Sequence, residues 1–245
     1  MQESVDIKKI VSQHLELDEF FSGGFAQKPR AVFQQDTEQI NPAGESIMNA
    51  SKTLQEIAEK VNKCRKCQIG HERQHAVPGQ GNPTADIVFV GEAPGADEDA
   101  QGLPFVGRAG KLLDDIIKAM GLQRSSVFIT NTIKCRPPEN RDPKPDEILN
   151  CSPYLSRQLD AIRPKVIIAL GAHAAKTLLD TNEPIGRLRG FFHDYYYSPD
   201  SEPVKLMPTY HPAYLLRNYS VENRKRVWQD MQKVMDMLGL ESPKK

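Results

Sequence analysis

The sequence predicts an α/β protein: a three-layer α/β/α sandwich around a central, mostly parallel sheet of four strands. Four short apolar runs alternate along the chain with segments of helical spacing, which is typical of buried strands joined by right-handed crossovers. The chain has 245 residues, enough for one such domain with some additional chain. No apolar run is long enough to cross a bilayer, so we expect no membrane association.

The predicted elements begin after a long N-terminal extension, residues 1–50. Residues 1–22 place apolar side chains at roughly helical spacing, which predicts one short amphipathic helix. From residue 22 to about residue 51 the chain is rich in Gly, Gln, Asn, Pro and Ala without periodicity, which favours a disordered linker. The sequence does not identify a partner for this extension.

A folded domain is predicted over residues 51–240, with a flexible tail at 241–245. Its first helix is expected at about 53–62. The apolar runs that we expect to form the strands are 86–91, 127–131, 165–170 and 204–210. The later helices, expected from their periodicity, are 111–120, 145–162, 172–179 and 221–238. Because ligands of such sheets bind beyond the carboxyl ends of the strands, the residues just after each strand are the candidates for function.

A glycine-rich segment follows the first predicted strand. Residues 91–110 contain five glycines and two prolines, which allow the backbone to approach a ligand closely and to direct its amides toward it. The segment has neither the spacing of a dinucleotide-binding loop nor the Lys-Ser/Thr pair of a phosphate-binding loop, so it does not predict a nucleotide site. Asn131 and His211 end two other strands, and each alone is typical of a cap or a turn.

Four cysteines need an explanation in a chain of this size. The start of the sequence lacks the basic and apolar pattern of a secretory signal, so we expect a cytoplasmic protein with reduced thiols. Cys64 and Cys67 form a C-x-x-C pair, and Cys135 and Cys151 flank a proline-rich, charged stretch. Four thiolates are a complete set for a zinc ion or an iron–sulfur cluster, and the spacing does not separate the two. A disulfide pair, or four inert buried thiols, is the alternative.

The charge of the chain is unevenly distributed. Lys+Arg and Asp+Glu both number 32, which gives a net charge of zero. Residues 1–50 hold four basic and eight acidic side chains, so residues 51–245 hold 28 and 24. This modest basic surplus permits nucleic-acid binding without predicting it.

Five motifs follow one another in the predicted domain. They are Gly91-Glu-Ala-Pro-Gly95, Pro104-Phe-Val-Gly107, Ile129-Thr-Asn131, Lys134-Cys-Arg-Pro-Pro138 and His211-Pro-Ala-Tyr-Leu-Leu-Arg217. Together they resemble a family 4 uracil-DNA glycosylase, from about Ser51 to Leu238, in motif order and spacing. The four cysteines resemble the set that holds the 4Fe-4S cluster of that family. We expect a structural cluster, because hydrolysis of a glycosidic bond moves no electrons.

The resemblance implies a monofunctional uracil-DNA glycosylase of base excision repair. Such an enzyme acts on uracil-containing DNA, here as a monomer, flips the base out and hydrolyses its N-glycosidic bond to leave an abasic site. One alternative is a superfamily relative that binds or crosslinks uracil-DNA without turnover. Those relatives carry a basic, His-containing insertion after the asparagine of the second strand, whereas only Thr132 and Ile133 separate Asn131 from the next motif. A zinc module that binds nucleic acid without catalysis is the third possibility.

The resemblance also implies roles for single residues in base recognition. Phe105 is expected to stack on the flipped base. The Asn131 amide should donate to uracil O4 and accept from N3–H, a pattern that cytosine presents in reverse. Backbone amides around Gly91, Glu92 and Ala93 should help to hold the base. His211 is expected to stabilise charge on uracil O2 as a neutral donor, with a tautomer that the sequence does not reveal.

Carboxylate and DNA-contact residues follow from the same resemblance. Ala93 stands where family 1 enzymes carry a water-orienting aspartate, so Glu98 is expected to position the water or stabilise the cation, with Glu92 or Asp97 as alternatives. The residues expected to enter the duplex are Tyr214, Leu215 and Leu216, with Arg217 on a phosphate. The side chains that we expect along the DNA backbone are Arg108, Lys111, Lys134, Arg136 and Arg141.

Overall fold

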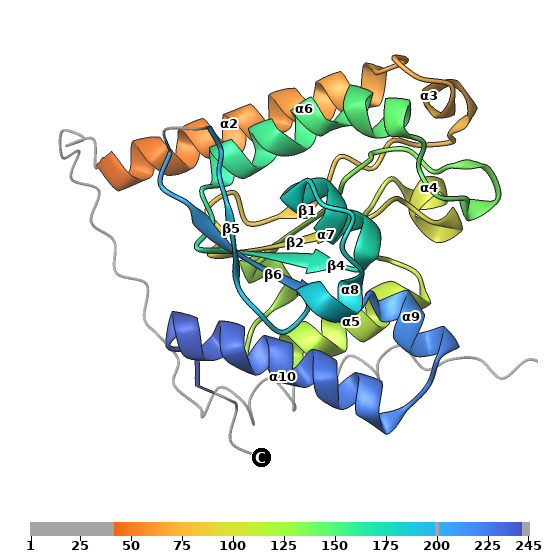
Figure 1. Ribbon diagram of the computed structural model, residues 1–245. Coiled ribbons are helices and arrows are strands. Elements are labelled where there is room, and N and C mark those ends of the chain that lie inside the picture. The colour runs from red at the N-terminus through yellow and green to blue at the C-terminus, as the bar shows by residue number, and fades with distance from the viewer. Residues whose placement is uncertain (1–41, 199–200, 242–245) are drawn as a thin grey trace, which may run out of the picture. The chain divides into compact units, whose positions relative to one another are not determined.

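The computed structural model of the chain describes residues 42–198 and 201–241 (Figure 1). Within them lies one mixed sheet of six strands in the order β1-β3-β2-β4-β6-β5. The strands are β1 (Gln80–Gly81), β2 (Ile87–Gly91), β3 (Phe128–Asn131), β4 (Val166–Leu170), β5 (His193–Tyr195) and β6 (Val204–Thr209). The predicted helix at residues 1–22 and the tail at 242–245 lie outside the described residues.

The four predicted strands form the parallel centre of the sheet. β2 pairs in parallel with β3 and β4, and β4 pairs in parallel with β6. The sheet has two strands more than we expected, because β1 and β5 add short antiparallel strands at its edges. Their two and three residues include no apolar run, so periodicity could not reveal them.

Helices cover both faces of the sheet, as predicted for a three-layer sandwich (Figure 1). The longer ones are α2 (Pro42–Lys63), α5 (Arg108–Ala119), α6 (Pro145–Ile162), α7 (Ala172–Leu179) and α10 (Val221–Leu238). The shorter ones are α3 (Ile69–Glu72), α4 (Ala96–Gln101), α8 (Ile185–Leu188) and α9 (Pro212–Arg217), with 3₁₀ turns at Arg124–Ser126 and Pro138–Asn140. No helix in the described ranges is long and apolar enough to span a membrane.

Alternate side chains of the central strands enter two separate cores. Ile87 and Phe89 of β2 pack with α5 and α10, whereas Val88 and Val90 pack with α6 and α7. All five residues of β2 are buried, as are those of β4. The continuous apolar runs of the sequence therefore reflect a sheet that is covered on both faces.

α2 begins at Pro42, well before the predicted start near residue 53, so the last part of the expected linker is helical. Proline fits the first turn of a helix, where its missing N–H leaves no hydrogen bond unmade. Further along, Ile57 and Val61 are fully buried and pack with Tyr154 of α6. This packing against α6 stabilises a helix whose first ten residues have poor helical propensity.

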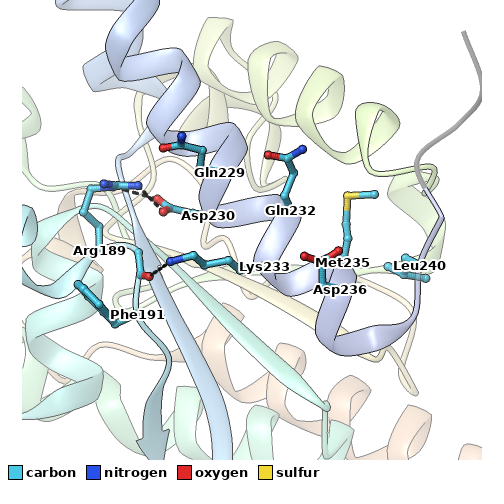
Figure 2. Close-up of a pocket in the computed structure, with 10 residues that line it drawn as sticks. Arg189, Phe191, Gln229, Asp230, Gln232, Lys233, Met235, Asp236 and Leu240 are labelled. Carbon is cyan, nitrogen blue, oxygen red and sulfur yellow. Dashed lines mark hydrogen bonds and ion pairs between the residues drawn. The ribbon is translucent and has the colours of Figure 1, made fainter.

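The buried carboxylate of Asp230 connects α10 to the end of β6. Figure 2 shows its ion pair with Arg189. Asp230 accepts a hydrogen bond from Thr209 Oγ1 at 2.6 Å and pairs with Arg189, while Lys233 Nζ donates to the Gly190 carbonyl. Arg189, Asp230 and Lys233 border a cavity of about 670 Å³ beside α10. The Arg189–Asp230 pair and the Lys233 hydrogen bond anchor α10. The Thr209–Asp230 hydrogen bond fixes the strand end that precedes His211.

Candidate active site at the carboxyl edge of the sheet

A second cavity of about 670 Å³ lies at the carboxyl ends of the parallel strands. The strand register brings these ends level, because Gly91 pairs with Asn131 and Leu170 with Thr209. Side chains from five separate segments therefore meet there. The sequence-predicted residues that line the cavity are Glu92, Ala93, Glu98, Phe105, Asn131, Arg141, His211, Tyr214 and Arg217.

Asn131 presents an unpaired acceptor inside this cavity. Its residue is 1% exposed, and its Oδ1 atom is buried without a hydrogen-bond partner. Buried polar atoms are nearly always paired in folded proteins, so this oxygen marks a place where a ligand donor belongs. Gly91 lets Asn131 and Phe105 approach the backbone closely: a Cβ atom on it would lie 2.4 Å from Asn131 Oδ1 and 2.6 Å from Phe105 Cζ.

Phe105 forms an aromatic wall of the same cavity. Its φ of 51° lies in the left-handed region, a conformation that costs about 1–3 kcal/mol for such a residue and persists only where neighbours hold it. Gly110 permits it, because a Cβ there would lie 1.9 Å from the Phe105 carbonyl oxygen. The Phe105 and His211 rings are stacked, with centroids 5.6 Å apart and planes 29° from parallel.

His211 is held in one tautomer by the backbone. The N–H of Ala213 donates to His211 Nδ1 at 3.0 Å, so this nitrogen carries no proton and the neutral ring has its hydrogen on Nε2. Burial, with a smaller effect from the Arg217 charge, lowers the pKa of His211 to about 4. At neutral pH the imidazole is therefore uncharged with its hydrogen on Nε2, the tautomer that the sequence left open.

Glu98 has a different position from the one expected of a water-binding carboxylate. Its Oε2 accepts from the Gly95 N–H at 3.0 Å, and its Oε1 accepts from the amides of Val106 and Gly107 at 2.9 and 3.0 Å. Three of the roughly four lone-pair positions of the carboxylate are thereby occupied. Glu98 thus connects the segment at Gly95 to the segment at Val106 and Gly107 in the glycine-rich loop. We therefore describe it as a positioning residue.

Two residues that we did not predict stand beside Glu92. His173, in the first turn of α7, and Asp142 each place a potential ligand atom within 4.8 Å of the others and of Glu92. His173 Nε2 lies 3.4 Å from Asp142 Oδ1. Burial raises the pKa of Glu92, as does Asp142 to a smaller extent, while His173 and Arg217 oppose the shift. His173 comes three residues after the end of β4, and this position beyond a strand end is the sequence signal that points to it.

The helix α9 corrects one DNA-contact expectation. Tyr214 lines the cavity and Arg217 is exposed at its border. Leu215, however, is only 4% exposed and faces the core, whereas the next residue, Leu216, is 45% exposed. Successive side chains of a helix point in different directions, so Leu215 faces the core while Leu216 faces solvent. The exposed leucine available to a partner is therefore Leu216.

The five basic side chains expected along DNA differ in their surroundings. Arg136 is half-buried, and its Nε donates to Asn140 Oδ1 at 2.9 Å. Arg108 and Lys111 at the start of α5 are exposed. Arg141 pairs with the buried carboxylate of Glu147 at 2.6 Å, which gives it a structural role. Lys134 was predicted wrongly: it is 1% exposed and its ammonium cannot reach DNA. Burial lowers the pKa of Lys134 to about 8, against the opposing effect of Cys151 and Cys135.

The four cysteines gather around one small pocket between α2, α3, α6 and the segment after β3. Arg73 Nη1 donates to Cys135 Sγ at 2.8 Å, and the Lys134 N–H lies 3.2 Å from Cys151 Sγ. Burial raises the pKa of the Cys151 thiol to about 11 and also raises those of Cys67 and Cys135. Deprotonation at neutral pH thus requires a positively charged partner, which is what a metal centre provides.

Comparison with known proteins agrees with this geometry. Residues 78–232 match the family model of the uracil DNA glycosylase superfamily. A type-4 uracil-DNA glycosylase from Saccharolobus solfataricus is 50% identical over 188 residues, covering 75% of this chain and 85% of the relative. The type-4 uracil-DNA glycosylase of Archaeoglobus fulgidus is 43% identical over 196 residues, covering 78% and 96%. That of Thermotoga maritima is 42% identical over 186 residues, covering 76% and 94%.

The match includes every segment that contributes to the cavity, from the glycine-rich loop to α9. The family model covers more than half of the chain, and the identity to these relatives extends over most of it. The chain belongs to the uracil-DNA glycosylase superfamily and, within it, to the type-4 uracil-DNA glycosylases.

Proposed function

We propose that this protein is a monofunctional uracil-DNA glycosylase of base excision repair, which flips uracil out of DNA and hydrolyses its N-glycosidic bond to leave an abasic site. The observation that carries the proposal is the buried, unpaired Asn131 Oδ1 beside the Phe105 ring. The glycosylase names of its relatives support the same reaction. The cytoplasmic location and monomeric state expected from the sequence stay predictions.

Recognition of uracil follows from the donor and acceptor pattern of Asn131. Its free Oδ1 accepts the N3–H of uracil, and its amide nitrogen donates to O4. Cytosine has an acceptor at N3 and a donor at N4, so both contacts would oppose it, and unpaired buried groups give strong discrimination. Phe105 supplies the stacking surface, and Gly91 lets Phe105 and Asn131 pack close to the strand end.

His211 stabilises the leaving group. Cleavage leaves an anionic base, and an N–H aimed at O2 lowers the barrier most when it is fixed before the reaction. The Ala213 amide fixes the ring so that Nε2–H is the available donor. A neutral donor avoids the cost of burying a charged imidazolium in this cavity.

Glu92 takes the role of positioning the attacking water or stabilising the sugar cation. It lines the cavity, with His173 and Asp142 around it, whereas the Glu98 carboxylate is occupied by three loop amides. Among the described residues that line the cavity there is no lysine, which supports direct hydrolysis without a Schiff base and hence without strand cleavage. Tyr214 and the exposed Leu216 are then the wedge into the duplex, with Arg217 near a phosphate.

A 4Fe-4S cluster fits the four cysteines better than zinc does. A zinc ion about 2.3 Å from each sulfur would hold the sulfurs about 3.8 Å apart. In the described part of the chain, the group of three metal-ligating side chains within 4.8 Å is Glu92, Asp142 and His173, so no three cysteine sulfurs come that close. The cluster, held by Cys64, Cys67, Cys135 and Cys151, would cross-link α2, α3, α6 and the end of β3.

The test is excision from a fluorescent uracil-containing oligonucleotide by protein whose iron content and visible absorption are measured first. Wild-type protein should produce alkali-labile abasic sites. Asn131→Ala should lower kcat/KM by about 10²–10³-fold, because both base contacts are lost. Asn62→Ala, an exposed asparagine at the end of α2, is the matched control and should behave as wild type.

Three outcomes would contradict parts of this proposal. Intact DNA after incubation and alkali, with cluster-loaded protein, would exclude the reaction. An adduct that survives denaturing electrophoresis would favour the crosslinking alternative. A colourless, zinc-containing protein that excises uracil would refute the cluster alone.

A further inference from the structure

Lys134 places a fully buried ammonium between the cysteine site and the base-reading end of β3. It follows Asn131 by three residues and directly precedes Cys135 in the chain. Its side chain is among the largest that are fully enclosed in the described structure, at 1% exposure. Neither the DNA-contact role expected from the sequence nor the chemistry of the cavity accounts for a buried charge at this point.

All three donors of the ammonium are used, and all three acceptors are neutral oxygens. Lys134 Nζ donates to Thr130 Oγ1 at 2.6 Å, to the Asn131 carbonyl at 2.7 Å and to Gln158 Oε1 at 2.7 Å. Within the described residues no carboxylate pairs with this ammonium. A buried charge without a counter-charge is costly, so something at this site must compensate it.

The compensating charge is on the cysteine side. The Lys134 backbone N–H lies 3.2 Å from Cys151 Sγ, and a second cation, Arg73, donates a hydrogen bond to Cys135 Sγ. A group held by four thiolates carries net negative charge, since its ligands must be deprotonated. Occupation of the cysteine site therefore provides the counter-charge that keeps Lys134 in place.

The same segment fixes the floor of the cavity. The Thr132 N–H donates to the Gly91 carbonyl and the Ile133 N–H to the Glu92 carbonyl, at 2.9 and 3.1 Å. Gln158, which accepts from Lys134, in turn donates to the Pro78 carbonyl at 2.6 Å. Movement of Lys134 would thus disturb the carbonyl of Asn131 directly and the strand end that carries the base-reading amide.

We propose that Lys134 is a positioning residue that couples the four-cysteine site to uracil recognition: the thiolate-bound group holds its ammonium, and the ammonium holds the strand end that orients Asn131. The inference rests on the proposed function. The proposal predicts that the cysteine site supports uracil binding through the Lys134 side chain, in addition to stabilising the fold.

The experiment compares holoprotein with Lys134→Met, Gln158→Leu and a matched surface control, Lys165→Met. Methionine has a side chain of similar length to lysine but lacks the positive charge and the three N–H donors. Lys165 lies at the amino end of β4 and pairs with exposed Asp86, away from the cavity. Iron content, melting temperature, the reduction potential of the cluster, inhibition by free uracil and affinity for abasic-site DNA are measured for each protein.

Lys134→Met should weaken inhibition by free uracil at least tenfold at equal iron content, while its affinity for abasic-site DNA stays within twofold of wild type. The reduction potential should become more negative, because removal of a nearby positive charge disfavours the added electron. Gln158→Leu should weaken uracil inhibition by a smaller factor with the cluster potential unchanged, and Lys165→Met should match wild type throughout. If Lys134 served stability alone, Lys134→Met would lower the melting temperature without weakening uracil binding more than binding of abasic-site DNA.

Wild-type uracil inhibition in cluster-loaded Lys134→Met would overturn the coupling. If that variant does not fold or load, Gln158→Leu decides, and wild-type uracil affinity in it would overturn the proposal. Failure of the proposed function is distinguishable, because the wild-type protein would then neither bind uracil nor excise it.

Discussion

The imidazole of His211 is fixed in one protonation state by its backbone neighbours, which leads to a testable pH dependence. Burial lowers its pKa to about 4, below the ordinary 6.5 of histidine. The unfolded chain therefore binds more protons between these values, so the stability contributed by neutral His211 is present above pH 6.5 and is lost as the pH falls toward 4. In ¹⁵N NMR, assigned with His211→Ala, the ring should stay in the Nε2–H form from pH 8 to about 5.

Two results would refute this account of His211. Titration near 6.5 would show that its surroundings do not hold the ring neutral. A proton on Nδ1 at neutral pH would show that the Ala213 N–H does not donate to it, and the donor aimed at uracil O2 would then be lost.

At the level of single residues, the sequence revealed those that follow strands. Asn131 and His211 come at the ends of β3 and β6, and the parallel arrangement of these strands is enough to predict that the two side chains share one cavity. Leu215 and Lys134 were misplaced because a motif does not show which side of a short helix or turn faces inward. His173 and Asp142 were missed because their proximity depends on how the loop that carries Asp142 packs against the start of α7.

The loop between β2 and α5 is the element on which base binding most depends, and Glu98 organises it. In Glu98→Ala three loop amides lose their acceptor, and unsatisfied amides cost roughly 1–3 kcal/mol each where they are buried. We expect a fall in melting temperature of about 5–10 °C and a raised KM, with kcat changed little. Calorimetry and steady-state kinetics measure these effects.

Gln101→Ala, at the exposed end of α4, serves as the control for this substitution and should leave both quantities unchanged. If Glu98 instead holds the attacking water, Glu98→Ala will lower kcat strongly at an unaltered melting temperature. That pattern would return to Glu98 the role that we assign to Glu92.

Among the elements, long apolar runs were predictable and short polar ones were not. Each of the four central strands begins and ends within one residue of its predicted bounds, because a strand buried on both faces leaves a continuous apolar run. The early start of α2 was hidden, because residues 42–51 lack helical periodicity and continue a helix that packs against α6 further along, at Ile57 and Val61. Tertiary contacts override local propensity at such points.

On the scale of the whole molecule, the zero net charge divides between two parts of the chain. The chain divides into residues 1–39 and residues 40–245. The first part holds four basic and seven acidic side chains, a net charge of −3, so the second part has +3. Because DNA binding is driven largely by phosphate contacts, the acidic part should weaken it at low salt through long-range repulsion.

Removal of residues 1–39 tests this division of charge. The shortened protein should keep its iron content, its melting temperature and, within twofold, its kcat, since every residue that we place in the cavity and the cysteine site lies in 40–245. Its affinity for uracil-containing DNA at about 20 mM salt should rise by about twofold to fivefold, and the difference should vanish near roughly 0.3 M salt, where charges separated by more than a few ångströms are screened. An equal affinity at every salt concentration would show that the acidic segment does not act on DNA through its charge, and a loss of activity would show that the catalytic unit extends into it.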